Sequence, residues 1–281
     1  MTGAAPSTSL TARIRAAGER LGDRLEAEIL ATVALGQPRR WLYAHGESVP
    51  DPATAARFEA LLQQRLEGVP IAYLSGQREF YGRPFRVDPR VLIPRPETEH
   101  LVEFALKLNL PERARVADIG TGSGCIILSL ACERPGWRCI GCDLSTDALQ
   151  VAEMNRSLLA ADHVALVQGD LLEPIKDLRF ELIVANPPYV AEGDPHLERG
   201  DLRHEPIAAL TPGGDGLDLL RRLAREAPEL LVAGGWLAVE HGHDQAESVR
   251  ALFAAARLQD IASIRDLGGI ERITVGRKST N

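Results

Sequence analysis

The sequence predicts an α/β protein with a doubly wound, mostly parallel sheet of seven strands and a small N-terminal helical domain. From residue 116 onward, short apolar segments alternate with helical segments, which is the pattern of parallel strands joined by crossover helices. Residues 8–75 carry helical periodicity instead. A length of 281 residues suits one α/β domain with a small appendage.

The N-terminal segment repeats apolar side chains three or four positions apart, as on the buried stripe of a helix. The first two stripes are Leu10, Ile14, Ala17 and Leu21, then Leu25, Ile29 and Val33. Gly22 and Gly36 are expected to end these two helices. Asp51-Pro52 opens a further helix, whose stripe is Phe58, Leu61, Leu62 and Leu66. We therefore expect a helical domain over residues 1–78.

Residues 79–96 change to short extended pieces interrupted by glycine and proline, which indicates a β-hairpin linker. The larger domain then occupies residues 97–281. Its predicted strands are 116–120, 138–143, 164–170, 180–185 and 236–240, with helices at 125–133, 146–159, 217–231 and 245–256. Segments 261–266 and 271–277, joined by Gly268-Gly269, predict a final antiparallel hairpin.

Composition excludes some function classes. The net charge of −7 argues against a sequence-independent grip on nucleic acid, which needs a basic surface. No apolar run approaches the roughly 18 residues of a membrane span, so no membrane contact is expected.

The four cysteines, at positions 125, 132, 139 and 142, raise the alternatives of a zinc site or a redox pair. Cys139 and Cys142 lie three apart in a predicted strand and would face opposite sides of it. We interpret all four as buried thiols of a reduced, cytoplasmic protein, and we expect no metal. His241 and His243 lack convincing further ligands and are interpreted as loop residues after a strand.

A glycine-rich segment follows the first predicted strand and opens the next helix. It consists of Gly120, Thr121, Gly122, Ser123 and Gly124. Glycines allow a ligand to approach the backbone closely. Their spacing differs from the dinucleotide fingerprint, and no Lys follows as in a phosphate-binding loop, so NAD and ATP are disfavoured.

Two carboxylates extend this candidate site along the same edge of the sheet. Asp143 ends the second predicted strand and Asp170 the third, where each can accept ribose hydroxyls. Leu171 is available to pack on an adenine. Together these groups describe a nucleoside pocket without a pyrophosphate device, for which S-adenosylmethionine is the fitting ligand. The alternatives are a tight turn for the glycines and helix N-caps for the aspartates.

The segment Asn186-Pro187-Pro188-Tyr189 stands at the end of the apolar run 180–185. Amide and exocyclic amine nitrogens are poor nucleophiles because their lone pairs are delocalised, so they must be held and aimed. The Asn186 side-chain oxygen and a proline-constrained carbonyl can each accept one N–H, while the Tyr189 ring can stack on the flat group. The segment predicts a methyl-transfer site for a planar NH2 group; the alternative is a strand end with a Pro-Pro turn.

Because it contains the glycine-rich segment 120–124 and the segment 186–189, the C-terminal part resembles the class I S-adenosylmethionine-dependent methyltransferases that methylate amide or amino nitrogen. These enzymes have a Rossmann-like fold. Further segments resemble those of the bacterial peptide chain release factor N5-glutamine methyltransferases. They are residues 70–76, 78–82, 93–99, 194–197, 200–201 and 204–206. The resemblance runs from about residue 70 to 277, and a helical N-terminal domain also belongs to that family's architecture.

The resemblance implies methylation of N5 of the glutamine in the Gly-Gly-Gln loop of class 1 release factors. Catalysis would use Asn186 and the Pro187 carbonyl to hold the amide, and Tyr189 to stack on it, with Pro188 completing the substrate site. The cofactor would contact residues 120–124, Asp143, Asp170, Leu171 and Asn186. Arg95, in the segment that shapes the pocket rim, is either a substrate contact or an ion-pair partner of Glu97 or Glu99. The helical domain would recognise the protein substrate, and residues 97–281 would form the catalytic domain.

Three other functions compete with this interpretation. A ribosomal-protein glutamine methyltransferase shares the Asn-Pro-Pro-Tyr box. An adenine-N6 methyltransferase of nucleic acid acts on the same planar NH2 geometry, but base flipping needs a basic strand-binding surface. A noncatalytic S-adenosylmethionine-binding scaffold is opposed by the intact Asn186–Tyr189 segment. We expect no direct contact with nucleic acid.

Overall fold

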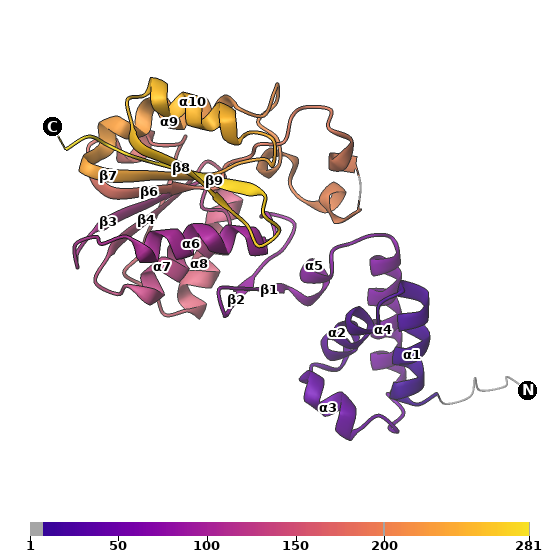
Figure 1. The fold of residues 1–281 in the computed structure, drawn as a ribbon. Coiled ribbons are helices and arrows are strands. Elements are labelled where there is room, and N and C mark those ends of the chain that lie inside the picture. Colours follow the sequence, from indigo (N-terminus) through magenta and orange to yellow (C-terminus); the bar gives the residue numbers. More distant parts are fainter. Residues whose placement is uncertain (1–7, 199, 281) are drawn as a thin grey trace, which may run out of the picture. The chain divides into compact units, whose positions relative to one another are not determined.

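The structure, a computed structural model, describes residues 8–198 and 200–280. It divides into two compact units, shown in Figure 1. The helical unit comprises the chain up to Gln77 together with Gly200–His204, and the sheet unit comprises the remainder from Arg78. Residues 79–96, expected as a linker, lie within the sheet unit.

The helical unit is built from five α-helices and one 3-10 segment among the described residues. They are α1 (Leu10–Leu21), α2 (Arg24–Leu35), α3 (Arg39–Ala44), α4 (Pro52–Leu66), α5 (Ile71–Ser75) and η4 (Gly200–His204). Asp51 caps α4 by accepting the backbone N–H groups of Ala53 and Thr54. Gly22 and Gly36 end α1 and α2 in the left-handed conformation, which confirms the predicted helix ends.

The core of the helical unit differs in part from the predicted stripes. Leu10, Ile14 and Ala17 of α1 are buried as expected. The predicted stripe of α2 is wrong, because Leu25 is 48% exposed and the helix buries another face. That face consists of Ala27, Leu30, Ala31 and Ala34. Both series recur at helical spacing, and small alanines let neighbouring helices approach closely. Leu66, in the last turn of α4, is also exposed rather than buried.

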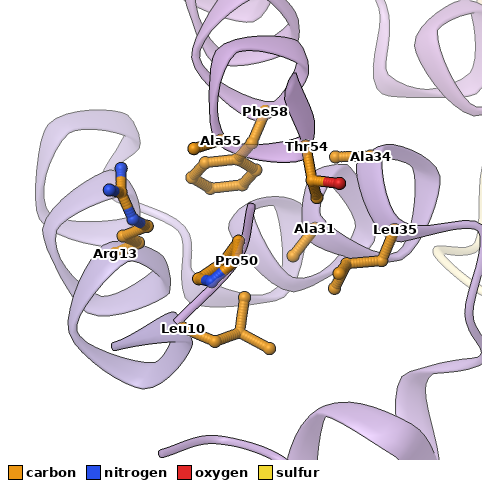
Figure 2. A pocket seen from close by; sticks show the side chains of 9 residues that line it. All are labelled: Leu10, Arg13, Ala31, Ala34, Leu35, Pro50, Thr54, Ala55 and Phe58. Atoms are coloured by element: carbon orange, nitrogen blue, oxygen red, sulfur yellow. The ribbon is translucent and has the colours of Figure 1, made fainter. Parts of the chain in front are cut away.

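A small space remains inside this core, between Leu10 of α1, Ala31 of α2 and Phe58 of α4 (Figure 2). Its volume is only about 10 Å³ and its walls are almost entirely apolar. A single water needs about that much room and also polar partners. The space is therefore a packing defect and not a ligand site.

The sheet unit contains the predicted seven-stranded sheet, in the order β5-β4-β3-β6-β7-β9-β8. Its strands are β3 (Arg115–Ile119), β4 (Arg138–Asp143), β5 (Ala165–Gln168), β6 (Phe180–Ala185), β7 (Leu231–Glu240), β8 (Gln259–Arg265) and β9 (Glu271–Arg277). Strands β3 to β7 are parallel, and β8 and β9 form the predicted antiparallel hairpin. β7 begins at Leu231, before the predicted residue 236. Gly234 and Gly235 interrupt the apolar pattern, so the first part of the strand was not predicted.

Helices cover both faces of this sheet (Figure 1). They are α6 (Glu99–Lys107), α7 (Cys125–Glu133), α8 (Thr146–Leu158), α9 (Asp218–Leu230) and α10 (Ala246–Ala255). α6, α7 and α8 pack on one face, and α9 and α10 on the other, each face with its own apolar core. α6, a short helix that buries Leu101, Val102 and Ala105, was not among the predicted elements.

Smaller elements complete the sheet unit. They are the β1 (Gln77–Phe80) and β2 (Arg83–Arg86) hairpin and the 3-10 segments η1 (Pro96–Thr98), η2 (Glu173–Ile175), η3 (Pro195–Glu198) and η5 (Ile207–Ala209). The turn between β1 and β2 places both Tyr81 and Gly82 at positive φ, as a two-residue hairpin requires. Across the described ranges, no helix has the length and apolar character needed to cross a membrane.

Candidate active site

A cavity of about 410 Å³ lies in the sheet unit at the carboxyl ends of the central strands. The chain order reverses at β3, which has β4 on one side and β6 on the other. In open α/β sheets ligands bind at this switch point. Residues that follow β3, β4, β5 and β6 line the cavity, together with parts of segments 90–98 and 206–209. The predicted glycine loop and Asn186 therefore meet in one place.

The glycine loop after β3 adopts a backbone that only glycine takes readily. Gly120, Gly122 and Gly124 all have positive φ. The backbone N–H groups of Gly120 and Thr121 both donate to the Cys142 carbonyl at 2.9 Å, which ties the loop to β4. A Cβ at Gly120 or Gly122 would meet no atom within 4 Å, so the space above the loop is open. The loop has the form of a cradle for a ligand.

Asp143 is the last residue of β4 and lines the cavity, as predicted. Its carboxylate accepts the backbone N–H of Gly122 at 2.8 Å and that of Ser145 at 2.9 Å. Burial raises the pKa of this carboxyl. Ser145, not Asp143, caps α8. Each carboxylate oxygen retains a further lone pair, so Asp143 can brace the loop and still accept a ligand hydroxyl.

Asp170 and Leu171 also line the cavity, beyond the end of β5. The strand ends at Gln168, two residues earlier than expected. The Asp170 carboxylate accepts hydrogen bonds from both terminal nitrogens of Arg222, at 3.0 and 2.9 Å, and its side chain is 53% exposed. Leu171 has a φ of 50°, in the left-handed region that is unfavourable for leucine. Such strained backbone conformations are frequent at ligand-binding sites.

Asp118, in β3 beneath the loop, was not assigned a role from the sequence. It is completely buried, and one carboxylate oxygen accepts the Thr121 hydroxyl at 2.6 Å. The other oxygen has no hydrogen-bond partner in the described part of the chain. Burial raises the pKa of Asp118 to about 7. Its contact with Thr121 fixes the loop from below.

Asn186 follows β6 and faces the cavity, where Pro188 also contributes to the wall. The Asn186 amide nitrogen donates to the Thr98 hydroxyl at 3.1 Å. Thr98 in turn donates to the carboxylate of Glu240 at 2.6 Å. Thr98 and Glu240 are both buried. Thr98 lies in the segment 93–99 that was expected at the pocket rim, but its bond to Asn186 was not predicted, and Glu240 was not identified from the sequence.

Pro187 and Tyr189 are not among the residues lining the cavity. Pro187 is buried, and Tyr189 packs against the core on the α9 side of the sheet. The Tyr189 hydroxyl donates to Glu240 at 3.3 Å. Burial raises the pKa of Tyr189, and it raises the pKa of Glu240 to about 7. The segment thus presents Asn186 and Pro188 to the cavity and anchors Tyr189 behind them.

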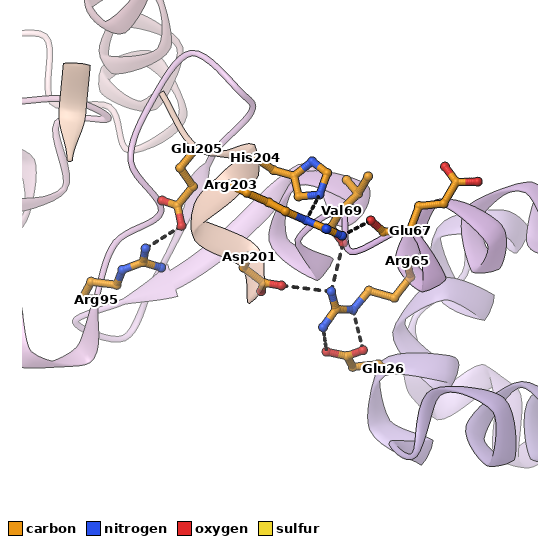
Figure 3. A network of polar contacts seen from close by, with 9 residues as sticks. All are labelled: Glu26, Arg65, Glu67, Val69, Arg95, Asp201, Arg203, His204 and Glu205. Carbon is orange, nitrogen blue, oxygen red and sulfur yellow. Dashed lines mark hydrogen bonds and ion pairs between the residues drawn. The ribbon is translucent and has the colours of Figure 1, made fainter. Parts of the chain in front are cut away.

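Arg95 lines the cavity, but its ion-pair partner differs from the predicted Glu97 or Glu99. Its guanidinium donates to Glu205 at 2.5 Å (Figure 3). Glu205 also accepts the Ile93 backbone N–H at 3.0 Å. Glu99 instead accepts the backbone N–H of Tyr81. Partners 110 residues apart in sequence cannot be found from local spacing. The pair fixes Arg95 at the cavity wall.

The cysteines are free thiols, with Cys139 and Cys142 in the cores on opposite faces of the sheet, as predicted. Burial raises the pKa of Cys125, Cys139 and Cys142 to about 12, so these thiols stay protonated and unreactive. The described residues contain no cluster able to hold a metal ion. His241 is buried directly after β7, bonded to the Gly242 carbonyl and the Thr274 hydroxyl.

Two known families cover most of the chain. Residues 8–76 match the PrmC N-terminal domain, and residues 98–258 match the Methyltransferase small domain. Three similar relatives carry the name release factor glutamine methyltransferase. That of Xylella fastidiosa (strain 9a5c) is 48% identical over 95% of this chain and 97% of its own. That of Bordetella pertussis is 50% identical, and the alignment covers 90% of this chain and 94% of the relative. That of Escherichia coli K12 is 42% identical, and the alignment covers 90% of this chain and 92% of the relative.

Solved structures show the same fold. A methyltransferase from Pyrococcus furiosus aligns with a TM-score of 0.54 at 17% identity, over 71% of this chain and 91% of its own. The catalytic domain of human Mettl16 with an RNA hairpin aligns with a TM-score of 0.56 at 15% identity, over 81% and 80%. At such low identity these two structures support the architecture of the sheet unit alone.

Proposed function

Because the chain belongs to the release factor glutamine methyltransferase family, we propose that it methylates the side-chain amide nitrogen of the glutamine in the Gly-Gly-Gln loop of class 1 release factors. The observation that carries the proposal is the position of Asn186. Its amide stands at the wall of the cavity, next to the glycine loop and Asp143. A glutamine amide needs a side chain that both donates and accepts, and asparagine does so.

We propose S-adenosylmethionine as the methyl donor, and the residues present fit it. The open backbone over Gly120 and Gly122 accommodates the close approach of a ligand, and Asp143 offers lone pairs to ribose hydroxyls. Leu171 provides an apolar wall for the adenine. When bound, the cofactor would supply a methyl group on a sulfonium, whose carbon a nitrogen lone pair can attack while the thioether leaves with the electrons of the C–S bond.

The protein's task is then orientation. Asn186 accepts one N–H of the substrate amide through its side-chain oxygen. The other N–H is assigned to the backbone carbonyl of Pro187, which is itself buried but stands between the cavity-lining residues Asn186 and Pro188. The nitrogen face is thereby directed at the donor site, and such positioning supplies much of the rate. The methylated amide nitrogen carries a positive charge and is therefore strongly acidic, and it loses one proton to water. The pocket rim around Arg95 shapes the approach of the substrate loop.

We assign recognition of the folded substrate to the helical unit, which has its own core. The sheet unit contains the whole cofactor cavity. A protein substrate also agrees with the net charge of −7, which disfavours nucleic acid.

The test is a panel of substrates incubated with the enzyme and labelled S-adenosylmethionine. A class 1 release factor, ribosomal proteins and RNA are compared at equal concentration. We expect label on the release factor alone. Label on ribosomal protein would favour the related glutamine methyltransferases, and label on adenine in RNA would refute a protein substrate.

A further inference from the structure

We propose that Thr98 and Glu240 are positioning residues that fix the orientation of the Asn186 amide during methyl transfer. This inference rests on the proposed function, because it acts through Asn186. The three side chains come from separate segments of the sheet unit: the end of η1, the residue after β6 and the last residue of β7. They form one chain of hydrogen bonds, which we call the Asn186 relay.

The direction of each bond in the relay follows from counting hydrogens. When Glu240 is ionised it can only accept, so the single hydrogen of the Thr98 hydroxyl lies in the 2.6 Å contact with the Glu240 carboxylate. The hydroxyl can then only accept from Asn186, so the Asn186 atom at 3.1 Å must be the amide nitrogen. The carboxylate at one end therefore determines which way the amide at the other end faces.

This orientation matters for a substrate that is itself an amide. With its nitrogen held by Thr98, Asn186 directs its side-chain oxygen away from Thr98 and can offer it to the substrate. If the Asn186 amide rotated by half a turn, an NH2 group would oppose the NH2 group of the substrate glutamine. Two donors cannot bond to each other, and the nucleophile would lose its acceptor.

The burial of Glu240 supports a role beyond packing. Its exposed fraction is 1%, and placing a carboxylate in such a site is unfavourable unless hydrogen bonds compensate. The recorded side-chain donors to it within the described ranges are Thr98 and Tyr189. Both partners lead to the Asn186–Tyr189 segment, so one buried carboxylate holds both ends of that segment.

The relay is tested with a matched pair of variants at Thr98. Thr98→Val keeps the shape and removes the hydroxyl, whereas Thr98→Ser keeps the hydroxyl. We expect Thr98→Val to lower kcat for glutamine methylation by about tenfold or more, since Asn186 is then free to turn. Thr98→Ser should remain within about threefold of the parental kcat. Cofactor affinity, measured by calorimetry, should change by less than about threefold in both.

A double variant separates positioning from an independent effect. If Thr98 acts through Asn186, then Asn186→Ala with Thr98→Val will be no slower than Asn186→Ala alone. Independent roles would multiply the two losses. Glu240→Gln provides a second route should Thr98→Val not fold, because a glutamine can donate to Thr98 and reverse the relay; the same fall in kcat is expected.

Two results overturn the relay. One is a parental kcat in folded Thr98→Val or Glu240→Gln, and the other is multiplied losses in the double variant. In both cases a slow Asn186→Ala enzyme would leave the proposed function standing. A parental rate in Asn186→Ala would instead remove the proposed function and the relay together.

Discussion

At the scale of single residues, two buried carboxyls stand out beside the cavity. Asp118 and Glu240 are 0% and 1% exposed, and burial raises the pKa of each to about 7. Glu240 receives two side-chain donors, whereas one oxygen of Asp118 has no partner in the described segments. Asp118 therefore contributes to stability chiefly in its protonated form.

The Asp118 proton makes stability depend on pH. Its ordinary pKa is 3.8 and its folded pKa about 7, so the folded protein holds a proton that the unfolded chain has released between these values. The stabilisation is full below about pH 4 and is lost as the pH rises through about 7. The Asp118→Asn side chain cannot titrate. In this variant the free energy of unfolding, plotted against pH, should therefore fall less steeply than in the parent, by about 1 kcal/mol per pH unit between about pH 5 and 7.

Denaturant unfolding at several pH values measures this slope. Asp215→Asn is the control, because the Arg221 guanidinium lowers the pKa of Asp215 to about 2, outside the window. The same slope in the parent and in Asp118→Asn would contradict the assignment.

Asp143 and Asp170 allow a comparison of two carboxylates at one cavity. Asp143→Ala should weaken S-adenosylmethionine binding by about 1.5 to 3 kcal/mol, because a buried acceptor for ribose hydroxyls and loop N–H groups is lost. Asp170→Ala should cost less, since the Asp170 side chain is 53% exposed and water can replace the hydrogen bonds that it makes. Isothermal calorimetry checks both. An unchanged affinity in Asp143→Ala would remove Asp143 from the cofactor site.

At the scale of elements, the turn after β6 packs closely against a glycine that is distant in the sequence. Gly216 has φ of 79°, and a Cβ there would lie 2.3 Å from the Tyr189 carbonyl oxygen. Because the clash is with backbone, the turn itself would have to move. Gly216→Ala should therefore reduce the methylation rate by at least about tenfold while cofactor affinity changes much less.

Gly193→Ala is the matched control for this variant. Gly193 has a similar φ of 77°, but its Cβ would meet no atom within 4 Å. It carries the same backbone strain without the clash, and it should retain most of the rate. If both variants lose the rate equally, strain in the loop and not the position of the turn would be the cause.

The sequence predicted those elements whose signals are local. Apolar strands such as 180–185 and glycine-capped helices such as α1 follow from short patterns, and Asn186 and Asp143 follow from strand ends. The predicted buried face of α2 was wrong, because this helix contains two sets of apolar residues at helical spacing and the structure buries the other set. The bonds that join Thr98 and Glu240, 142 residues apart, to Asn186 could not be predicted, because only the folded sheet brings these residues together.

At the scale of the whole molecule, one segment connects the two units along the chain. Gly200–His204 belongs to the helical unit, where Arg65 donates to Asp201, to Glu26 and to the Val69 carbonyl (Figure 3). The next residue, Glu205, is held in the sheet unit by Ile93 and Arg95. Residues 206, 208 and 209 then line the cavity. The helical unit and the cavity wall thus share one short stretch of chain.

Arg65→Ala tests the anchoring of this segment. The Arg65 side chain is 19% exposed, and its loss leaves several acceptors unpaired, which should cost about 1 to 3 kcal/mol of stability. Hydrogen exchange at Asp201–His204 should accelerate, and KM for an intact release factor should rise more than KM for a Gly-Gly-Gln peptide. Arg20→Ala, which removes a more exposed ion pair with Glu59, should change neither. Equal KM effects on both substrates would contradict the assignment of substrate recognition to the helical unit.

The central claim is that Asn186 aims the glutamine amide of a release factor at the bound methyl donor. Single-turnover methylation of a Gly-Gly-Gln peptide, followed by tandem mass spectrometry, tests it most directly. We predict one added methyl group on the glutamine side chain with the parental enzyme. Folded and cofactor-bound Asn186→Ala should be slower by on the order of tenfold to several hundredfold. A parental rate in that variant, or a methyl group on any other residue, would contradict the claim.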